Sequence, residues 1–310
     1  MKISIGPALF EWGKQALRDF YRRMAFETPA DILYMGEVVC SKRNNLDPEE
    51  LVAFARELQP SGKQIVFSSL GLVMTEGELA TMRRLAALAR EEGIWLEAND
   101  LAGLAIGEGQ PLAAGPHITT YNTDTLAMLA EIGVKRAALP VELPLTSIAA
   151  LAASRSGGAP EIEVFAHGKL PLTFSARCYT ARAFHLPKSN CQYRCGDFPD
   201  GMTMSTQEGM ELLTLNGVET MSDAVFCGLG DLEALRKAGV DILRLSPQSR
   251  NMKEIVEVWH QRLLGRLDGA EALARLRELN EGRAFCNGYL HGRAGLDFID
   301  ASRQQATWGL

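Results

Sequence analysis

The sequence predicts a TIM-barrel-like (β/α)8 fold, an α/β class, and three observations lead to that prediction. Short runs of β-branched residues recur along the chain, and the early ones alternate with longer segments of helical apolar spacing. About eight such units occupy the 310 residues, which favours a closed barrel over an open sheet. No GxGxxG follows the first run, so a dinucleotide-binding sheet loses its main support.

The predicted strands leave room for a helix between most neighbours, as parallel strands joined by crossovers require. They are 2–6, 31–36, 64–69, 93–100, 117–122, 135–142, 161–168 and 240–247.

Two of the helical segments carry clear end signals. Residues 47–60 begin with Asp47 as the expected N-cap and Pro48 in the first turn. Residues 75–93 have Thr75 and Glu78 at the spacing of a capping box and end at Gly93. The first of these helices has one apolar face, formed by Leu51, Phe54, Ala55 and Leu58.

The regular alternation is interrupted between about 169 and 239. Asn216-Gly217 in this region predicts a hairpin between two short strands. We expect residues 1–310 to form one barrel-like domain, with 169–239 as an insertion at its C-terminal face. An irregular tail, about 283–310, is expected to pack back on the body.

Composition limits the classes of partner. The net charge of −6 and the pI near 5.5 argue against nucleic acid as a partner. No run approaches the roughly 18–20 apolar residues of a membrane helix, so the protein is expected not to be transmembrane. The N-terminal segment lacks the features of an export signal, which predicts a cytoplasmic protein with reduced thiols.

Three of the six cysteines gather in one cationic stretch: Cys178, Cys191 and Cys195. Residues 164–196 contain five Lys or Arg and no Asp or Glu. Nearby cations lower the pKa of a thiol, which helps it to bind a metal. If residues 191–195 are helical, the two cysteines of this CxxxC share one face.

A fourth sulfur ligand would come from elsewhere in the chain. Cys40 follows the second predicted strand and so lies on the C-terminal face of a barrel, which makes it the first candidate. Cys227 is the second and Cys286 the last. Four sulfurs suit zinc or an iron–sulfur cluster, and the scattered spacing favours the cluster. A set of metal-free buried thiols remains the other interpretation.

Polar residues at predicted strand ends are candidates for the barrel mouth, although no catalytic residue is assigned. Glu37 and His167 stand out because each is close in sequence to a proposed ligand or to the cationic stretch. The chain lacks GxSxG and HExxH, so a hydrolase has little support. The full set of strand-end residues is Glu37, Ser68, Glu97, Asn99, Asp100, Tyr121, Asn122, Glu142 and His167.

Three segments carry a resemblance to a known family: "GEVVCSKR", "SARCYTARAFHLPKSNCQYRCGDFPDGM" and "FCNGYLHGRAG". They closely resemble the UbiU/UbiV group within the collagenase-like (U32) peptidase family, and the similarity runs the full length of the chain. The resemblance implies a [4Fe–4S] cluster on four cysteines. The family pattern, one early cysteine and a later C-x₁₂₋₁₆-C-xxx-C, falls on Cys40, Cys178, Cys191 and Cys195. In some members a late cysteine near Cys227 replaces one of these, which keeps Cys227 as an alternative.

The resemblance also implies a function. Proteins of this group work as a heterodimer with a UbiU-like partner in anaerobic ubiquinone biosynthesis, where a prenylated ubiquinone precursor is hydroxylated without O₂. Prephenate is the implied oxygen donor. Two alternatives remain: a zinc- or cluster-containing hydrolase of the peptidase family, and an accessory scaffold whose cluster is structural.

Overall fold

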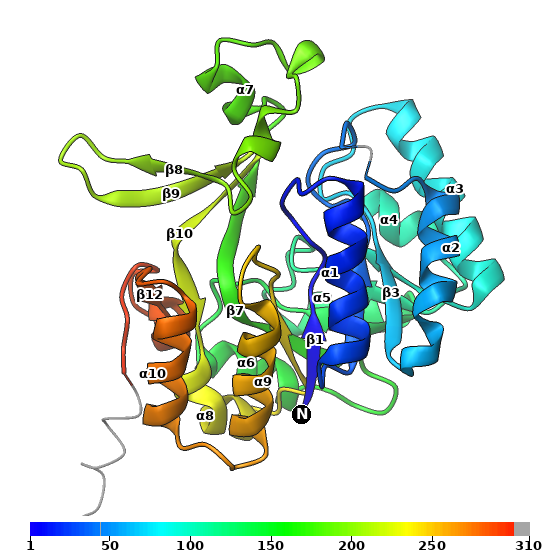
Figure 1. The fold of residues 1–310 in the computed structure, drawn as a ribbon. Helices are drawn as coiled ribbons and strands as arrows, with labels where there is room; N and C mark the ends of the chain where they lie inside the picture. The colour runs from blue at the N-terminus through cyan, green and yellow to red at the C-terminus, as the bar shows by residue number, and fades with distance from the viewer. Residues whose placement is uncertain (44, 301–310) are drawn as a thin grey trace, which may run out of the picture.

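Eight parallel strands close into a barrel in the computed structural model of the protein, which describes residues 1–43 and 45–300 (Figure 1). The barrel closes because β11 pairs in parallel with both β1 and β7. The predicted TIM-barrel-like fold is therefore confirmed. The barrel strands are β1 (Lys2–Ile5), β2 (Ile32–Met35), β3 (Gln64–Ser68), β4 (Trp95–Ala98), β5 (Leu112–Ala114), β6 (Val134–Ala138), β7 (Glu161–Phe174) and β11 (Ile242–Leu245).

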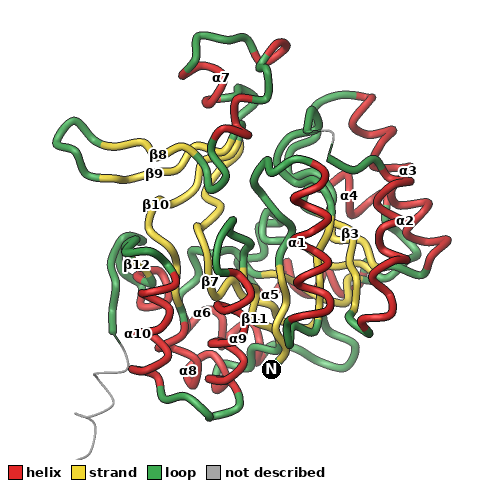
Figure 2. Tube along the Cα trace, viewed as in Figure 1, coloured by secondary structure: helices red, strands yellow, loops and turns green. Residues whose placement is uncertain are grey.

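Helices surround the barrel on its outside (Figure 2). The predicted capping boxes are both present, with Asp47 capping the helix that begins at Pro48 and Thr75 capping the one that begins at Glu76. The second of these helices ends, as expected, at Gly93 in the left-handed region, at φ 67°. The helices are α1 (Lys14–Glu27), α2 (Pro48–Leu58), α3 (Glu76–Glu92), α4 (Leu101–Ile106), α5 (Thr123–Glu131), α6 (Leu145–Ala153), α8 (Leu232–Lys237), α9 (Met252–Leu263) and α10 (Gly269–Leu279).

The strand predicted at 117–122 is wrong. The fifth strand is β5, three buried residues of Leu-Ala-Ala that carry no β-branched signal. Residues 117–122 form turns instead, in which the Ile118 amide donates to Gly115 O and the Thr120 amide to Ile118 O. Residues 112–114 pair with both β4 and β6 in the closed barrel. Their place between these strands, and not their local propensity, therefore makes them the fifth strand.

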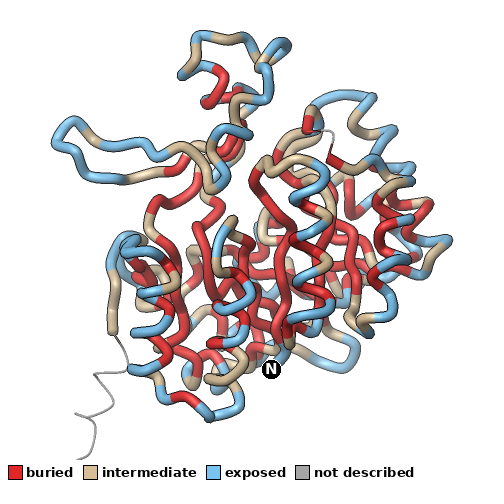
Figure 3. The backbone as a smooth tube through the Cα atoms, viewed as in Figure 1, coloured by how far each residue is buried: buried red, intermediate tan, exposed pale blue. Residues whose placement is uncertain are grey.

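The barrel strands are largely buried (Figure 3), and the buried residues include a charged network as well as apolar side chains. Arg244 Nε donates to Glu163 Oε1 at 3.0 Å, and the same guanidinium forms an ion pair with Glu97. Tyr34 donates to the other oxygen of Glu163 at 2.5 Å. The contacts of Arg244 with Glu97 and of Tyr34 with Glu163 join strands that are not neighbours in the sheet, so these side chains meet in the barrel lumen.

Residues from the second half of β7 to the hairpin at 216–217 lie beyond the barrel rim, whereas α8, which is also within 169–239, packs against the barrel core. β7 runs on past the barrel rim and pairs with antiparallel β10 (Glu219–Cys227). Beyond it follow β9 (Glu211–Asn216) and β8 (Met202–Ser205), which project away from the barrel in Figure 1. The hairpin expected at Asn216-Gly217 connects β9 to β10. The short α7 (Tyr179–Ala183) stands above the barrel together with the cysteine segment.

The described part of the C-terminal tail, residues 283–300, packs back on the insertion. Its β12 (Phe285–Cys286) pairs in parallel with β10, and the Asn287 side chain donates to Asp231 at 3.0 Å. Residues 301–310 of the predicted tail lie outside the described residues.

Candidate metal centre at the barrel mouth

Four cysteines line one small cavity of about 20 Å³ above the barrel. Cys40 comes from the loop that follows β2, whereas Cys178, Cys191 and Cys195 come from the segment between β7 and β8. All four residues that the sequence put forward as ligands therefore meet at one place.

The two remaining cysteines lie elsewhere, in the main core. Cys227 ends β10 and Cys286 ends β12, and both side chains are buried. Burial raises the pKa of each thiol to about 12, because the charged thiolate loses its solvation. Cys227, the alternative ligand, is thus separated from the thiol-lined cavity.

A second, smaller apolar cluster holds the cysteine segment on the barrel mouth. It packs residues of the β1–α1 loop and the β2–α2 loop against α7 and the β9–β10 hairpin, with Cys40 and Cys191 at its margin. Burial of this cluster, and not local sequence, brings position 40 next to positions 178–195. Its buried members are Leu9, Phe10, Val38, Val39, Cys178, Ala181, Val218 and Met221.

The two cations that follow Cys40 reinforce this contact. Lys42 Nζ donates to the carbonyl oxygens of Lys188 and Ser189 at 2.8 and 3.1 Å. Arg43 donates to Asn216 Oδ1 at 2.6 Å and to the carbonyl oxygen of Leu9. The basic side chains therefore join the loop of Cys40 to the cysteine segment and the hairpin.

Arg43 supplies a buried positive charge beside the thiols. Its guanidinium lines the thiol cavity and faces Glu37 at 3.6 Å and Glu11 at 3.9 Å. Burial nevertheless raises the pKa of Cys40 and of Cys195, and outweighs the lowering effect of Arg43 on both. The neighbouring cations therefore lower the pKa of these two free thiols as expected, but the net pKa is raised because desolvation is the larger effect.

The CxxxC segment is not the helix that was considered. Gln192 and Tyr193 both adopt left-handed backbone conformations, at φ 52° and 51°, and a 3₁₀ turn covers Arg194–Asp197. Two successive non-glycine residues in this region cost about 1 kcal/mol or more each and persist only where the surroundings enforce them. The loop brings Cys191 and Cys195 to the cavity by a tight backbone reversal.

Several strand-end residues have structural roles. Asp100 caps α4 through the Ala102 amide, and Asn122 caps α5 through the Thr125 amide. Tyr121 donates to Glu142 at 3.0 Å across neighbouring loops. These contacts give each of these residues, which were predicted to lie at strand ends, a role that needs no ligand.

Other strand-end residues join the barrel network. Ser68 donates to Glu97 at 2.6 Å, and Asn99 Nδ2 donates to the same carboxylate at 3.2 Å. Arg244, which the sequence reading missed, ion-pairs with Glu97 in this network. The only signal in the sequence was that Arg244 lies in the predicted strand 240–247, where alternate side chains point into the barrel. His167 is buried, its pKa is lowered to about 4 by burial, and its ring nitrogens lack a hydrogen-bond partner within the described residues.

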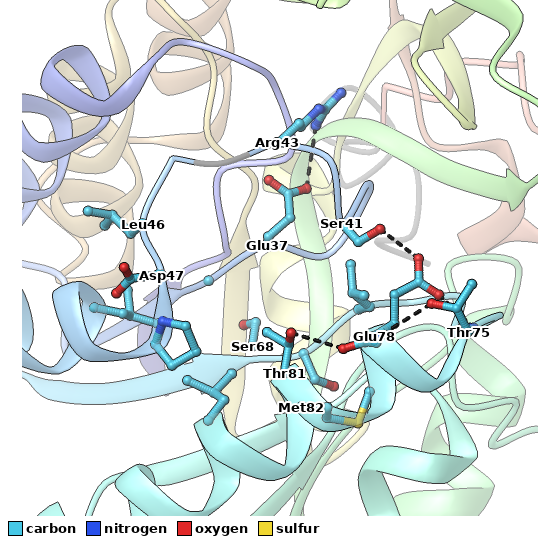
Figure 4. Close-up of a pocket in the computed structure, with 17 residues that line it drawn as sticks. Glu37, Ser41, Arg43, Leu46, Asp47, Ser68, Thr75, Glu78, Thr81 and Met82 are labelled. Carbon is cyan, nitrogen blue, oxygen red and sulfur yellow. Dashed lines mark hydrogen bonds and ion pairs between the residues drawn. The ribbon is translucent and has the colours of Figure 1, made fainter. Parts of the chain in front are cut away.

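Glu37 lines a second, larger cavity and faces Arg43, which also lines the thiol cavity (Figure 4). Its Oε1 accepts from the amides of Val39 and Cys40 at 2.9 and 3.0 Å, which shapes the turn that presents the Cys40 side chain. Burial raises the pKa of Glu37 to about 7.

The donor set fits a sulfur-ligated cluster. Four cysteines in an enclosed setting beside a guanidinium match the four thiolates and the charge compensation that a [4Fe–4S] cluster needs. In residues 1–43 and 45–300, no group of three or more His, Cys, Asp or Glu side chains has the arrangement of an ion site. No helix in the same residues is long and apolar enough to cross a membrane.

The fold and this site define a TIM-barrel protein with a cysteine-bearing insertion at its mouth. Residues 21–297 match the family model of peptidase family U32, and the chain belongs to that family.

Two solved structures show a remote similarity to this chain. A mutant tryptophan synthase α-subunit from Pyrococcus furiosus is 13% identical, with 94% of this chain and 98% of that chain covered and a TM-score of 0.45. A mandelate racemase/muconate lactonizing protein from Paracoccus denitrificans is 15% identical, with coverage of 54% and 48% and a TM-score of 0.40. The fold assignment rests on the closed sheet itself.

Proposed function

We propose that this chain is a UbiV-type [4Fe–4S] protein that acts with a UbiU-like partner in O₂-independent hydroxylation of a prenylated ubiquinone precursor, with prephenate as the oxygen donor. One observation carries the proposal: the four cysteines that the family pattern singles out line a single cavity. The reaction and the partner come from the resemblance of the cysteine segments to the UbiU/UbiV group.

Cys40, Cys178, Cys191 and Cys195 would hold the cluster, which supplies a one-electron redox centre when bound. Because all four ligands are protein thiolates, we assign the centre to electron transfer or to organisation of the site, and not to direct binding of the substrate.

The other residues of the site keep the ligands in place. Arg43 offsets negative charge at the thiolates, and its bond to Asn216 ties the loop of Cys40 to the hairpin. Lys42 donates to the carbonyl oxygens of Lys188 and Ser189 and so holds the backbone just before Cys191. The apolar cluster around Val38 and Met221 excludes water from one side of the cavity. Together they keep the ligand loops assembled around the centre.

Anaerobic purification followed by iron, sulfide and zinc analysis tests the proposal. We expect a brown protein with about four irons per chain, as a [4Fe–4S] centre requires. Cys40→Ala should lose this iron, and the matched core variant Cys227→Ala should retain it. A stoichiometric zinc content, or iron that depends on Cys227 and not on Cys40, would contradict the proposal.

A structural role for the cluster is the second candidate, because the ligands come from two separate loops that a cluster would cross-link. Single-ligand variants distinguish the two roles. If Cys191→Ala abolishes ring hydroxylation while the complex with the partner survives, the centre takes part in the chemistry. If the complex itself dissociates, the centre is a scaffold.

A further inference from the structure

A cavity of about 450 Å³ opens at the barrel mouth (Figure 4), and it shares Arg43 with the thiol site. Its floor is formed by Gly36 and Ser68, which follow or end β2 and β3, and its sides by the β2–α2 loop and the first turns of α2 and α3. This is the C-terminal face of the barrel, where TIM-barrel proteins place their ligands, and the volume is in the range of small-molecule sites.

One wall of the cavity is apolar. The side chains of Leu51, Met82 and Leu85 belong to α2 and α3 and are almost fully buried. Leu46 from the β2–α2 loop and Leu70 from the β3–α3 loop extend this surface. A wall of this kind fits a hydrocarbon or aromatic ring, and a methionine in it adapts to the shape of the ligand.

Most polar groups of the cavity are already used inside the protein. Ser41 donates to Glu78 at 2.6 Å, and the other oxygen of Glu78 accepts from the Thr75 amide at 3.0 Å. Asp47 accepts from the amide of Glu50 at 2.8 Å in the capping box at the start of α2. These groups hold the walls and leave little capacity for a ligand.

Glu37 is the exception at the inner end of the cavity. Its Oε1 takes the two loop amides, and Oε2 accepts no hydrogen bond from any described residue. Arg43, the one cation among the described lining residues, donates from its two terminal nitrogens to Asn216 and Leu9. Its charge faces Glu37 and Glu11, although its buried Nε has no hydrogen-bond partner among the described residues. The cavity thus presents an acceptor at the end of an apolar wall and no free cation for an anionic ligand.

We infer that this cavity binds a neutral phenol, with the ring against the leucine and methionine wall and the hydroxyl donating to Glu37 Oε2. An ammonium ligand fits less well at the inner end of the cavity, because Arg43 at 3.6 Å offsets the charge of Glu37 there. The other two carboxylates of the lining, Asp47 and Glu78, lie at the N-termini of α2 and α3, where the capping amides offset their charge.

The cavity also has a defined relation to the thiols. Arg43 lines both cavities, and the segment from Glu37 to Arg43 forms the partition that carries Cys40. A bound ring is therefore separated from the thiol site by one layer of chain. That the bound phenol is the ring to be hydroxylated rests on the proposed function, whereas the class of ligand rests on the lining residues alone.

Ligand-observed NMR with four probes tests the inference, on the full chain purified anaerobically. The probes are 4-propylphenol, propylbenzene, 4-propylbenzoate and 4-propylbenzylamine. We expect 4-propylphenol to bind most tightly. The inference is overturned if the benzoate or the amine binds more tightly than the phenol, or if none of the four binds.

Two variants locate the site. Thr81→Trp places an indole at the exposed rim of the cavity and should weaken 4-propylphenol at least about tenfold, whereas Ala80→Trp, one residue away and outside the lining, should not. Glu37→Gln keeps an acceptor for the loop amides but replaces the free one. The variant should bind 4-propylphenol about tenfold more weakly and propylbenzene with unchanged affinity. Glu76→Gln, at an exposed position outside the cavity lining, is its control.

Equal phenol binding by Thr81→Trp and the unmodified chain would refute this location. Iron content, measured on every sample, separates the two proposals. Iron-loaded protein without phenol binding refutes the cavity assignment alone. Phenol binding by a chain that never acquires iron refutes the cluster and leaves the cavity assignment standing.

Discussion

Arg244→Met should strongly destabilise the barrel at neutral pH. The Arg244 guanidinium neutralises Glu163 at 3.0 Å and also pairs with Glu97, and both carboxylates are fully buried. Its charge also lies over the ring of Tyr34, 4.1 Å from the centroid. Removing one partner of a buried ion pair leaves an uncompensated charge, which costs about 3–5 kcal/mol.

The loss should depend on pH in a defined direction. Burial raises the pKa of Glu163, but the charge and hydrogen bond of Arg244 outweigh it, so the pKa lies below its ordinary value. A lowered pKa stabilises the fold above the unfolded-state pKa of about 4.3, and this contribution is lost as the pH falls through the folded-state pKa. Without Arg244, only the smaller lowering effects of Arg136 and Ser4 oppose burial, and the pKa rises. The deficit of the variant should therefore be largest near pH 7 and shrink toward pH 5.

Urea unfolding, followed by circular dichroism at pH 7 and pH 5, measures both effects. Arg250→Met is the matched control, because its ion pair with Glu281 is exposed and worth at most about 1 kcal/mol. Adding Glu97→Gln and Glu163→Gln to Arg244→Met should restore much of the lost stability. A loss below about 1 kcal/mol at pH 7, or a larger loss at pH 5, would refute this account of the network.

Three further predictions follow from single contacts. In His167→Phe, the free energy of unfolding measured in urea should fall less steeply as the pH drops below about 6.5. The buried ring has a pKa of about 4, so below pH 6.5 the unfolded state binds a proton that the folded state does not, and this lowers the stability of the unmodified chain by about 1.4 kcal/mol per pH unit. Gly36→Ala should lower the urea midpoint by the equivalent of about 1–3 kcal/mol, since φ is 139° and the added Cβ lies 2.3 Å from Ser68 O. Asn216→Ala should reduce iron content in the purified protein, although it removes no sulfur, because Arg43 loses its anchor.

Local signals in the sequence were enough for most of the barrel. Asp47 and Thr75 cap their helices where the sequence placed them, because a capping box depends on residues only three positions apart. The strand at 117–122 failed for the opposite reason. Its β-branched residues formed turns, and the neighbouring segment 112–114 was taken into the sheet by barrel closure.

The cysteine site shows a similar division. The clustering of Cys178, Cys191 and Cys195 is visible in the sequence, and the position of Cys40 after a strand predicted its face of the barrel. The backbone reversal at Tyr193 was not predictable, because left-handed conformations at non-glycine residues depend on packing with the rest of the fold.

By itself, the sequence determined the alternation of strands and helices, the helix ends and the acid-free segment that carries three thiols, since all of these depend on neighbours along the chain. Only the tertiary structure decided that Cys40 meets those thiols while Cys227 stays in the core, and that Glu37 faces Arg43 beside them. The physical reason is that these contacts form when apolar loops are buried together on a closed barrel, and no local spacing encodes which distant side chains such burial brings into contact.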